Sequence, residues 1–241
     1  MHIILVSNKN QVPNAFSTQF PFNLGAYFNG GGGMNDYFST DSWLKVLFIH
    51  EIVHNYQLNA KKHKVSKFLH KYLGNNPTPV WTPFVSIPFF TMPNITLPTP
   101  IVEGNAVLNE SIYGNGGRLH SGYQNALKNM IILDNKLDVT RFINNHLEFP
   151  YLTEKYIVGG YFMEYLAHIY GVDKVNQFFY RHSNKFIFPF AVNHTFSRHF
   201  GKRYIELLDE FVQDTKTKYK DFKKLDGSLI ASSKDEIILN K

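Results

Sequence analysis

The chain has 241 residues, of which 44% are hydrophobic and 18% are charged, and it carries a formal net charge of +6. This composition is typical of a globular protein with one substantial core, and it excludes a largely disordered chain. Cysteine is absent. A disulfide framework and a cysteine-ligated metal site are therefore excluded, so any zinc must be held by histidine and carboxylate side chains.

The excess positive charge lies mainly in two lysine-rich segments, residues 61–71 and 216–224. No recognition motif accompanies them, so we expect no nucleic-acid partner. We interpret both segments as solvated helix faces, and weak contact with a membrane surface or an acidic partner is the alternative. No run of residues approaches the ~20 apolar residues that span a bilayer, and the N-terminus is typical of a strand rather than of a signal peptide.

The first 40 residues predict a small β-rich entry, and the rest of the chain predicts mainly helices. Short strands are expected at 3–6 and 22–29, before a glycine run at 30–33. The first long helix is expected to begin near Asp41, a candidate N-cap, and to continue to about residue 60. Further apolar periodicity predicts helices at 100–113, 121–131, 154–169, 172–182 and 202–222. We therefore expect an α+β fold.

A proline-rich segment, residues 77–100, interrupts this helical pattern. Its seven prolines exclude both a helix and a central strand, so we expect an extended, irregular segment. Long segments of this kind form functional lids or groove walls, although one that simply packs over the core is equally expected.

The HEIVH sequence at 50–54 falls inside the first long helix. Residues four apart share one helix face, so His50 and His54 can direct their rings at one point, as two ligands of a catalytic zinc site. Glu51 can then lie beside the attacking water and act as general base. The alternative is a pair of structural histidines beside a surface glutamate.

A third ligand must come from elsewhere, because no third histidine follows at the spacing of the extended HExxHxxGxxH motif. Glu103 and Glu110 are seven residues apart in an apolar stretch, and therefore lie on one helix face. One of them can bind zinc while the other accepts a hydrogen bond from the free ring N–H of a ligating histidine. We expect Glu103 to be the ligand.

The ordered motifs HEIVHNYQ, EGNAVLNES and YIVGGYFMEYLAHIYG resemble the gluzincin metallopeptidases, and most closely the bacterial group called peptidase MA-like. The resemblance covers about residues 40–182. It implies a thermolysin-like zincin with a small β-sheet lobe, a mainly helical lobe and the active-site helix at the cleft. The implied site has zinc (Zn2+) held by His50, His54 and Glu103, with Glu51 as general base and Glu110 behind a ligating histidine.

The resemblance also suggests that Tyr156, three residues before a glycine, donates to the developing oxyanion; the alternative is an aromatic of the helix core. It implies hydrolysis of a peptide or protein substrate by an endopeptidase in the bacterial envelope or outside the cell. A non-catalytic interaction or scaffold module with the same fold, and hydrolysis of a non-peptide bond, are the alternatives. No role is assigned to the other histidines, among them His199.

Two departures from the family bear on the substrate and on the domain limits. GGGMND at 31–36 resembles the Gly-x-Met-Glu-Asn strand with which related aminopeptidases hold a free amine, but Asn35 stands in the place of the glutamate. We therefore expect the strand at 22–29 to bind an extended peptide by adding it to the sheet. The domain is expected to span 1–222, divided into 1–40 and 41–222, with 223–241 as an extension resembling the start of a truncated β-propeller.

Overall fold

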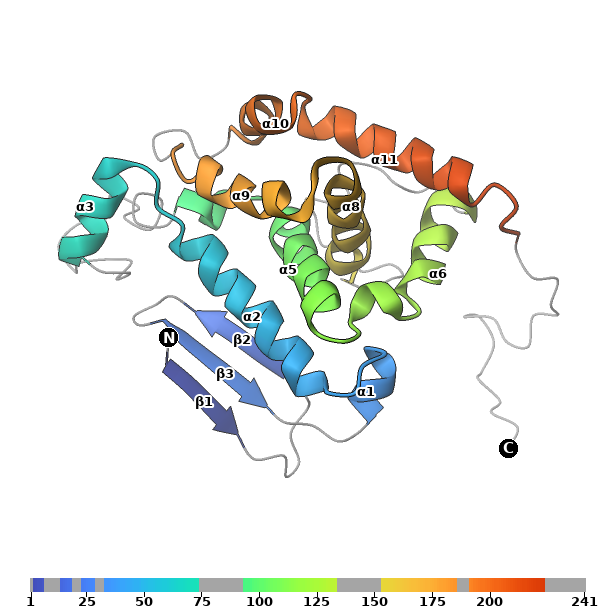
Figure 1. Cartoon of the computed structure of the whole chain (residues 1–241), viewed down its shortest axis with the longest axis horizontal. Helices are drawn as coiled ribbons and strands as arrows, with labels where there is room; N and C mark the ends of the chain where they lie inside the picture. The colour runs from blue at the N-terminus through green and yellow to red at the C-terminus, as the bar shows by residue number, and fades with distance from the viewer. Residues whose placement is uncertain are drawn as a thin grey trace, which may run out of the picture.

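The computed structural model describes residues 2–6, 14–18, 23–28, 33–73, 93–133, 153–185 and 191–223. It shows a mixed α+β fold in which a small sheet lies on one side of a larger group of helices (Figure 1). In the described part of the chain, no helix combines the length and the apolar character that crossing a membrane requires. The proline-rich residues 74–92, the glycines 30–32 and the extension from 224 onward lie outside the described residues.

The sheet has three strands in the order β1-β3-β2: β1 (His2–Val6), β2 (Asn14–Thr18) and β3 (Leu24–Phe28). β1 runs parallel to β3 and β2 runs antiparallel to it, so Ala26 of β3 faces Ile4 on one side and Phe16 on the other. The strands predicted at 3–6 and 22–29 correspond to β1 and β3, whereas β2 was missed. The peptide-binding role expected for 22–29 is wrong, because β3 is paired on both edges and offers no free backbone to a substrate.

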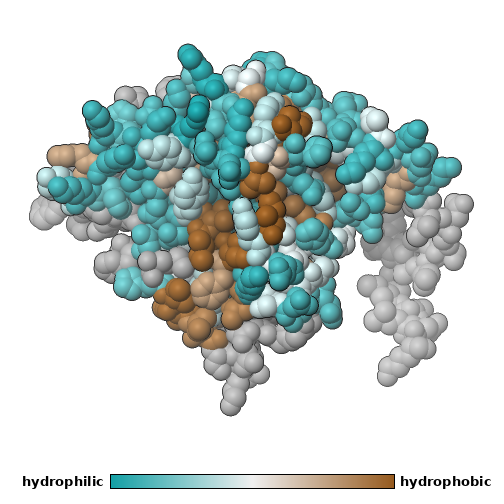
Figure 2. Space-filling view, in the orientation of Figure 1, coloured by the Kyte–Doolittle hydropathy of each residue, from teal (hydrophilic) through white to brown (hydrophobic). Residues whose placement is uncertain are grey.

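β1 is an outer strand whose side chains are largely exposed. Ile3, Ile4 and Leu5 are 49%, 48% and 65% exposed, and Figure 2 shows apolar residues gathered over this part of the molecule. β3 is buried instead, because the helix at Trp43–Asn59 packs over it: the ring of Tyr27 stacks on the ring of Phe48 in that helix, with 4.1 Å between centroids.

Two helices follow the sheet, the short α1 (Gly33–Tyr37) and the long α2 (Trp43–Asn59). The Ser42 hydroxyl, rather than Asp41, caps α2 by accepting from the Lys45 N–H at 3.4 Å. Asn35 lies in α1 and not in a strand. Its side-chain oxygen accepts from the Trp43 N–H at 2.8 Å, so Asn35 fixes the start of α2.

The centre of the helical part is the crossing of α5 (Thr99–Tyr113) and α8 (Glu154–Tyr170) (Figure 1). Gly104 and Gly159 form the closest point, where a Cβ on Gly104 would overlap the carbonyl of Gly159. The glycines of the EGNAV and YIVGG motifs therefore let the two backbones touch. This crossing brings Glu103, next to the first glycine, near Tyr156, one turn before the second.

An aromatic core lies beyond α8, between it and the last three helices, where Phe162, Phe178 and Phe196 are almost fully buried. These helices are α9 (Val172–His182), α10 (Val192–Phe200) and α11 (Tyr204–Lys218). The remaining helical elements are α3 (Lys64–Leu73), η1 (Pro93–Thr96), η2 (Arg118–His120), α6 (Tyr123–Lys128) and a π-helical turn, η3 (Asn129–Leu133).

The predicted helices are present, but the short α1 was not predicted, and two further differences appear. The sequence-based prediction missed α10, although its buried residues Phe196 and Phe200 are four apart, at helical spacing. The end of the proline-rich segment is also helical rather than extended: Pro93 begins η1, and Pro100 lies in the first turn of α5, where its missing N–H needs no partner.

Candidate metal centre

The HEIVH residues lie in the middle of α2, which contacts β2 on one side and α5 on the other. His50 and Glu51 are only 4% and 5% exposed, and His54 is partly buried. The apolar neighbours Val46 and Leu47 anchor this part of α2 in the core beneath it. The two histidines are thus held on a rigid helix at the junction of the sheet and the helical part.

The atoms predicted to bind metal converge. His50 Nε2 and His54 Nε2 are 3.0 Å apart, and Glu103 Oε2 lies 3.2 Å from the first and 3.1 Å from the second. Ligand atoms at ~2.0–2.1 Å from a tetrahedral zinc ion lie roughly 3.3 Å from one another, so the triangle is within a few tenths of an ångström of that size. Among the residues the structure describes, this is the one group of three or more His, Asp and Glu side chains arranged in this way.

The orientation of the His50 ring is fixed from behind. His50 Nδ1 lies 2.7 Å from Glu110 Oε2, and Glu110 is completely buried. Glu110 also accepts from the Arg118 side chain at 2.7 Å and from the Arg118 backbone N–H at 3.1 Å, so it is a carboxylate surrounded by donors. His50 therefore donates through Nδ1, which leaves the lone pair of its neutral form on Nε2.

The orientation of the His54 ring is fixed by an amide. His54 Nδ1 lies 3.0 Å from Gln57 Oε1. The amide nitrogen of Gln57 donates to the Val102 carbonyl at 3.0 Å and to Asn105 Oδ1 at 2.9 Å, which identifies the oxygen end of Gln57. His54 therefore also donates through Nδ1 and directs the lone pair of Nε2 toward Glu103.

Two imidazole lone pairs and one carboxylate oxygen thus face one another, and this arrangement needs a cation among them. A proton can supply the charge: burial opposes it, but hydrogen bonds to Glu103 and Glu110 raise the pKa of His50 to about 9. Burial also favours a neutral Glu103, yet with this proton in place the hydrogen-bond contacts with His50 and His54 hold the pKa of Glu103 well below its usual range. Two nitrogens and one carboxylate oxygen match the donor set of a catalytic zinc site, in which water takes the fourth position.

Glu51 lies next to the triangle and takes no part in it. It forms no hydrogen bond or ion pair with another described residue. Burial raises the pKa of Glu51, against the effect of the nearby His50 and His54. A buried carboxyl with an elevated pKa beside a metal-ligand set has the properties of a general base.

Tyr156 reaches the same region from the first turn of α8. Its ring lies 6.2 Å from the ring of His50 and contacts two cations, with Arg118 at 4.7 Å and Lys155 at 4.9 Å from the ring centroid. Burial, followed by the charge of Glu103, raises the pKa of Tyr156 to about 12, so the phenol keeps its proton at neutral pH. Its hydroxyl is therefore available as a hydrogen-bond donor.

The structure brings together all six residues predicted for the site, and it adds three that the sequence reading missed. Arg118 pairs with Glu110 and stacks over Phe38 at 4.7 Å. Gln57 and Asn105 orient His54. The contact of Gln57 with His54 could have been predicted from the sequence, since Gln57 follows His54 by three residues on the same helix. The contact of Arg118 with Glu110 could not have been predicted, because Arg118 lies in the short turn η2 and local spacing does not indicate which carboxylate pairs with it.

Comparison of the chain with family models, with curated proteins and with solved structures found no significant match. The geometry of the site is therefore the basis for any statement about function.

Proposed function

We propose that the chain is a zinc-dependent endopeptidase of the gluzincin type, with thermolysin-like architecture. A single observation supports this proposal: His50 Nε2, His54 Nε2 and Glu103 Oε2 face one another, and each pair of these atoms is 3.0 to 3.2 Å apart. The rings are set by partners on their far nitrogens, as is usual for histidine ligands of metals. A catalytic carboxylate, Glu51, and a protonated phenol, Tyr156, lie beside them.

Zinc bound to these three side chains would supply Lewis-acid activation of water and of a substrate carbonyl. Glu51 takes the proton from the attacking water and then delivers it to the leaving amine, which its elevated pKa favours. The Tyr156 hydroxyl donates to the carbonyl oxygen as negative charge grows on it. Glu110 and Gln57 keep the two histidines in the productive tautomer, so their role is positioning.

The strand arrangement suggests where a peptide would lie. β3 is internal, whereas β2 has no strand partner on its outer edge among the described residues and contacts α2, which carries the HEIVH motif. An extended peptide added to this edge would run alongside the active-site helix. The strand that pairs with the substrate is therefore β2, and not the strand at 22–29 that was expected from the sequence.

One observation favours a second candidate, a non-catalytic interaction module. The three predicted ligands already form a hydrogen-bonded group if one proton is shared among them, and Lys155 Nζ lies 3.6 Å from the free oxygen of Glu103. Such a group can stabilise α2 against α5 without a metal.

Cleavage of an unstructured protein distinguishes the two candidates. We expect protein purified without chelator to cleave it, and Glu51→Gln to lower kcat by ~10²–10⁴-fold while it retains its metal. Glu210→Gln, an equivalent change on the surface of α11, is the matched control and should leave kcat unchanged. Equal cleavage by wild type and Glu51→Gln, or none by wild type loaded with zinc, would contradict the peptidase proposal.

A further inference from the structure

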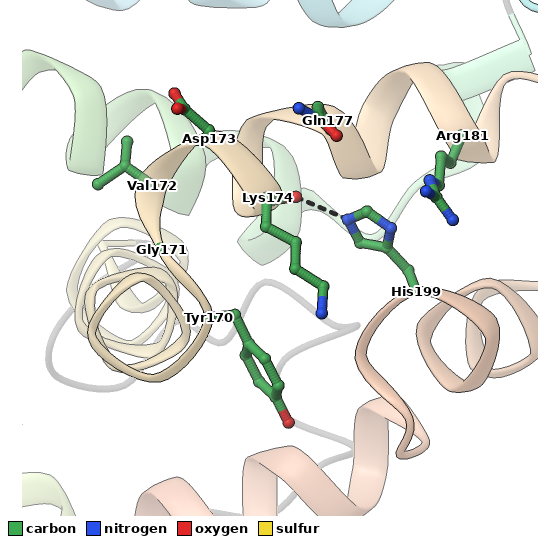
Figure 3. Close-up of a pocket in the computed structure, with 8 residues that line it drawn as sticks. All are labelled: Tyr170, Gly171, Val172, Asp173, Lys174, Gln177, Arg181 and His199. Atoms are coloured by element: carbon green, nitrogen blue, oxygen red, sulfur yellow. Dashed lines mark hydrogen bonds between the residues drawn. The ribbon is translucent and has the colours of Figure 1, made fainter.

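A hollow lined mainly by polar and charged residues lies at the beginning of α9, apart from the residues of the metal centre. Its volume is about 480 Å³, and it is bounded by Tyr170, by one face of α9 and by His199 of α10 (Figure 3). Lys174, Gln177 and Arg181 follow one another at helical spacing along this face of α9. Figure 2 shows mainly hydrophilic residues over the part of the surface where α9 and α10 lie.

The hollow is positively charged. Neither Lys174 nor Arg181 forms an ion pair with a carboxylate in the described ranges. Asp173 also borders the hollow, but its carboxylate points away from Lys174 and from His199 (Figure 3). An adjoining hollow of about 370 Å³ shares Arg181 and His199 and adds three further cations, Lys62, Lys185 and Arg198.

The backbone at this place also favours an anion. α9 begins after Gly171, whose φ is +87°, and no side chain caps the helix. The first N–H groups of a helix lack intrahelical acceptors and carry partial positive charge. The position of a Gly171 Cβ has no heavy atom within 4 Å, so the space in front of this helix end is open.

His199 provides an independent sign of a ligand. The residue is only 5% exposed, and its Nε2 donates to the Lys174 carbonyl at 2.6 Å (Figure 3). Its Nδ1 is buried and has no hydrogen-bond partner in the described part of the chain, and this edge of the ring is turned toward Arg181 (Figure 3). Burial lowers the pKa of His199, so the ring is neutral and Nδ1 is an acceptor that lacks a donor. Unpaired buried nitrogens are uncommon because they cost free energy.

We propose that this hollow binds a phosphate group that retains one hydroxyl. The phosphate oxygens accept from Lys174 and from Arg181, and the P–OH donates to His199 Nδ1; the partial positive charge at the start of α9 adds to the field of the two side chains. This donor distinguishes phosphate from sulfate, which offers acceptors alone at neutral pH. The same group can arrive as free phosphate or on a phosphomonoester lipid headgroup.

Calorimetric titration of the full chain with inorganic phosphate tests the proposal. We expect saturable binding that weakens roughly tenfold or more in Lys174→Gln and in Arg181→Gln, since each removes a charge-assisted hydrogen bond. Lys45→Gln removes the same charge from an exposed position on the first turn of α2 and should not change the affinity. The ring-nitrogen NMR signal of His199 should shift on binding, and sulfate should bind more weakly than phosphate.

Vesicles separate the two sources of the phosphate group. Saturation by free phosphate identifies a small ligand. Binding to vesicles that carry phosphatidate, but not to those that carry the phosphodiester phosphatidylglycerol, identifies a headgroup with the same chemistry. Absence of binding to both probes, equal binding of sulfate, or equal affinities in wild type, Lys174→Gln and Arg181→Gln would overturn the proposal.

Discussion

The carboxylate behind His50 allows the sharpest test of how the candidate metal centre is built. Glu110 is fully buried and accepts three hydrogen bonds, from His50 Nδ1 at 2.7 Å, from the Arg118 side chain at 2.7 Å and from the Arg118 N–H at 3.1 Å. Glu110→Gln keeps the shape but replaces one acceptor oxygen with an NH₂ group that faces donors. It also leaves the guanidinium of Arg118, whose side chain is 11% exposed, without its counter-ion.

The expected loss has two components. Breaking a buried ion pair from one side costs about 3–5 kcal/mol, so the free energy of unfolding should fall by roughly that amount. Loosening the hydrogen bond behind a ligating histidine typically lowers metal affinity by ~10–100-fold. Urea unfolding of the metal-free protein measures the first component, and competition with a zinc chelator measures the second.

The double variant Glu110→Gln/Arg118→Gln is the control. Removing both charges removes the isolated buried cation, so the double variant should lose less stability than the sum of the single variants, with a coupling of about 1–3 kcal/mol. Additive stability losses would refute the coupling between Glu110 and Arg118, and zinc affinity in Glu110→Gln equal to that of wild type would refute the reasoning that Glu110 orients His50.

Three further predictions concern packing, protonation and catalysis. Gly104→Ala should lower the free energy of unfolding by about 1–3 kcal/mol because its Cβ overlaps Gly159, whereas Gly122→Ala meets no atom within 4 Å and should be tolerated in the same urea experiment. The folded-state pKa of His50 lies above its unfolded value of 6.5, so the stabilisation that protonated His50 gives the metal-free fold is complete below pH 6.5 and is lost as pH rises to about 9. The midpoint of thermal unfolding of metal-free protein should therefore fall over this range. Zinc affinity, measured by competition with a chelator, should rise over the same range because zinc must displace the proton. A flat profile for both would contradict the proton assignment. Tyr156→Phe should lower kcat by ~10²-fold or more with zinc content unchanged, and an unaltered kcat would assign Tyr156 to packing.

The sequence predicted those parts of the molecule that depend on local spacing. His50 and His54 share a face because they are four apart on a helix, and Glu103 and Glu110 share a face because they are seven apart. α9 was predicted at its observed limits because its apolar residues recur at helical spacing. Local spacing also anticipated that one carboxylate would lie in front of the histidines and the other behind them.

The parts that were missed depend on contacts between distant segments. The order of strands in the sheet is tertiary, so the sequence did not reveal that β3 would be central and β2 an edge. Arg118 reaches His50 and Glu110 from a three-residue turn after a glycine-rich loop. His199 was treated as one histidine among many, because an unpaired nitrogen is visible only after α9 and α10 are packed together.

The central claim is that His50, His54 and Glu103 hold a zinc ion. Metal analysis of protein purified without chelator tests it most directly, with Glu103→Ala and the surface variant Glu210→Ala purified in parallel. The account predicts about one zinc per chain in wild type and in Glu210→Ala, and a large loss in Glu103→Ala. A wild-type protein without zinc that also fails to take it up, or a Glu103→Ala protein that binds zinc as wild type does, would contradict it.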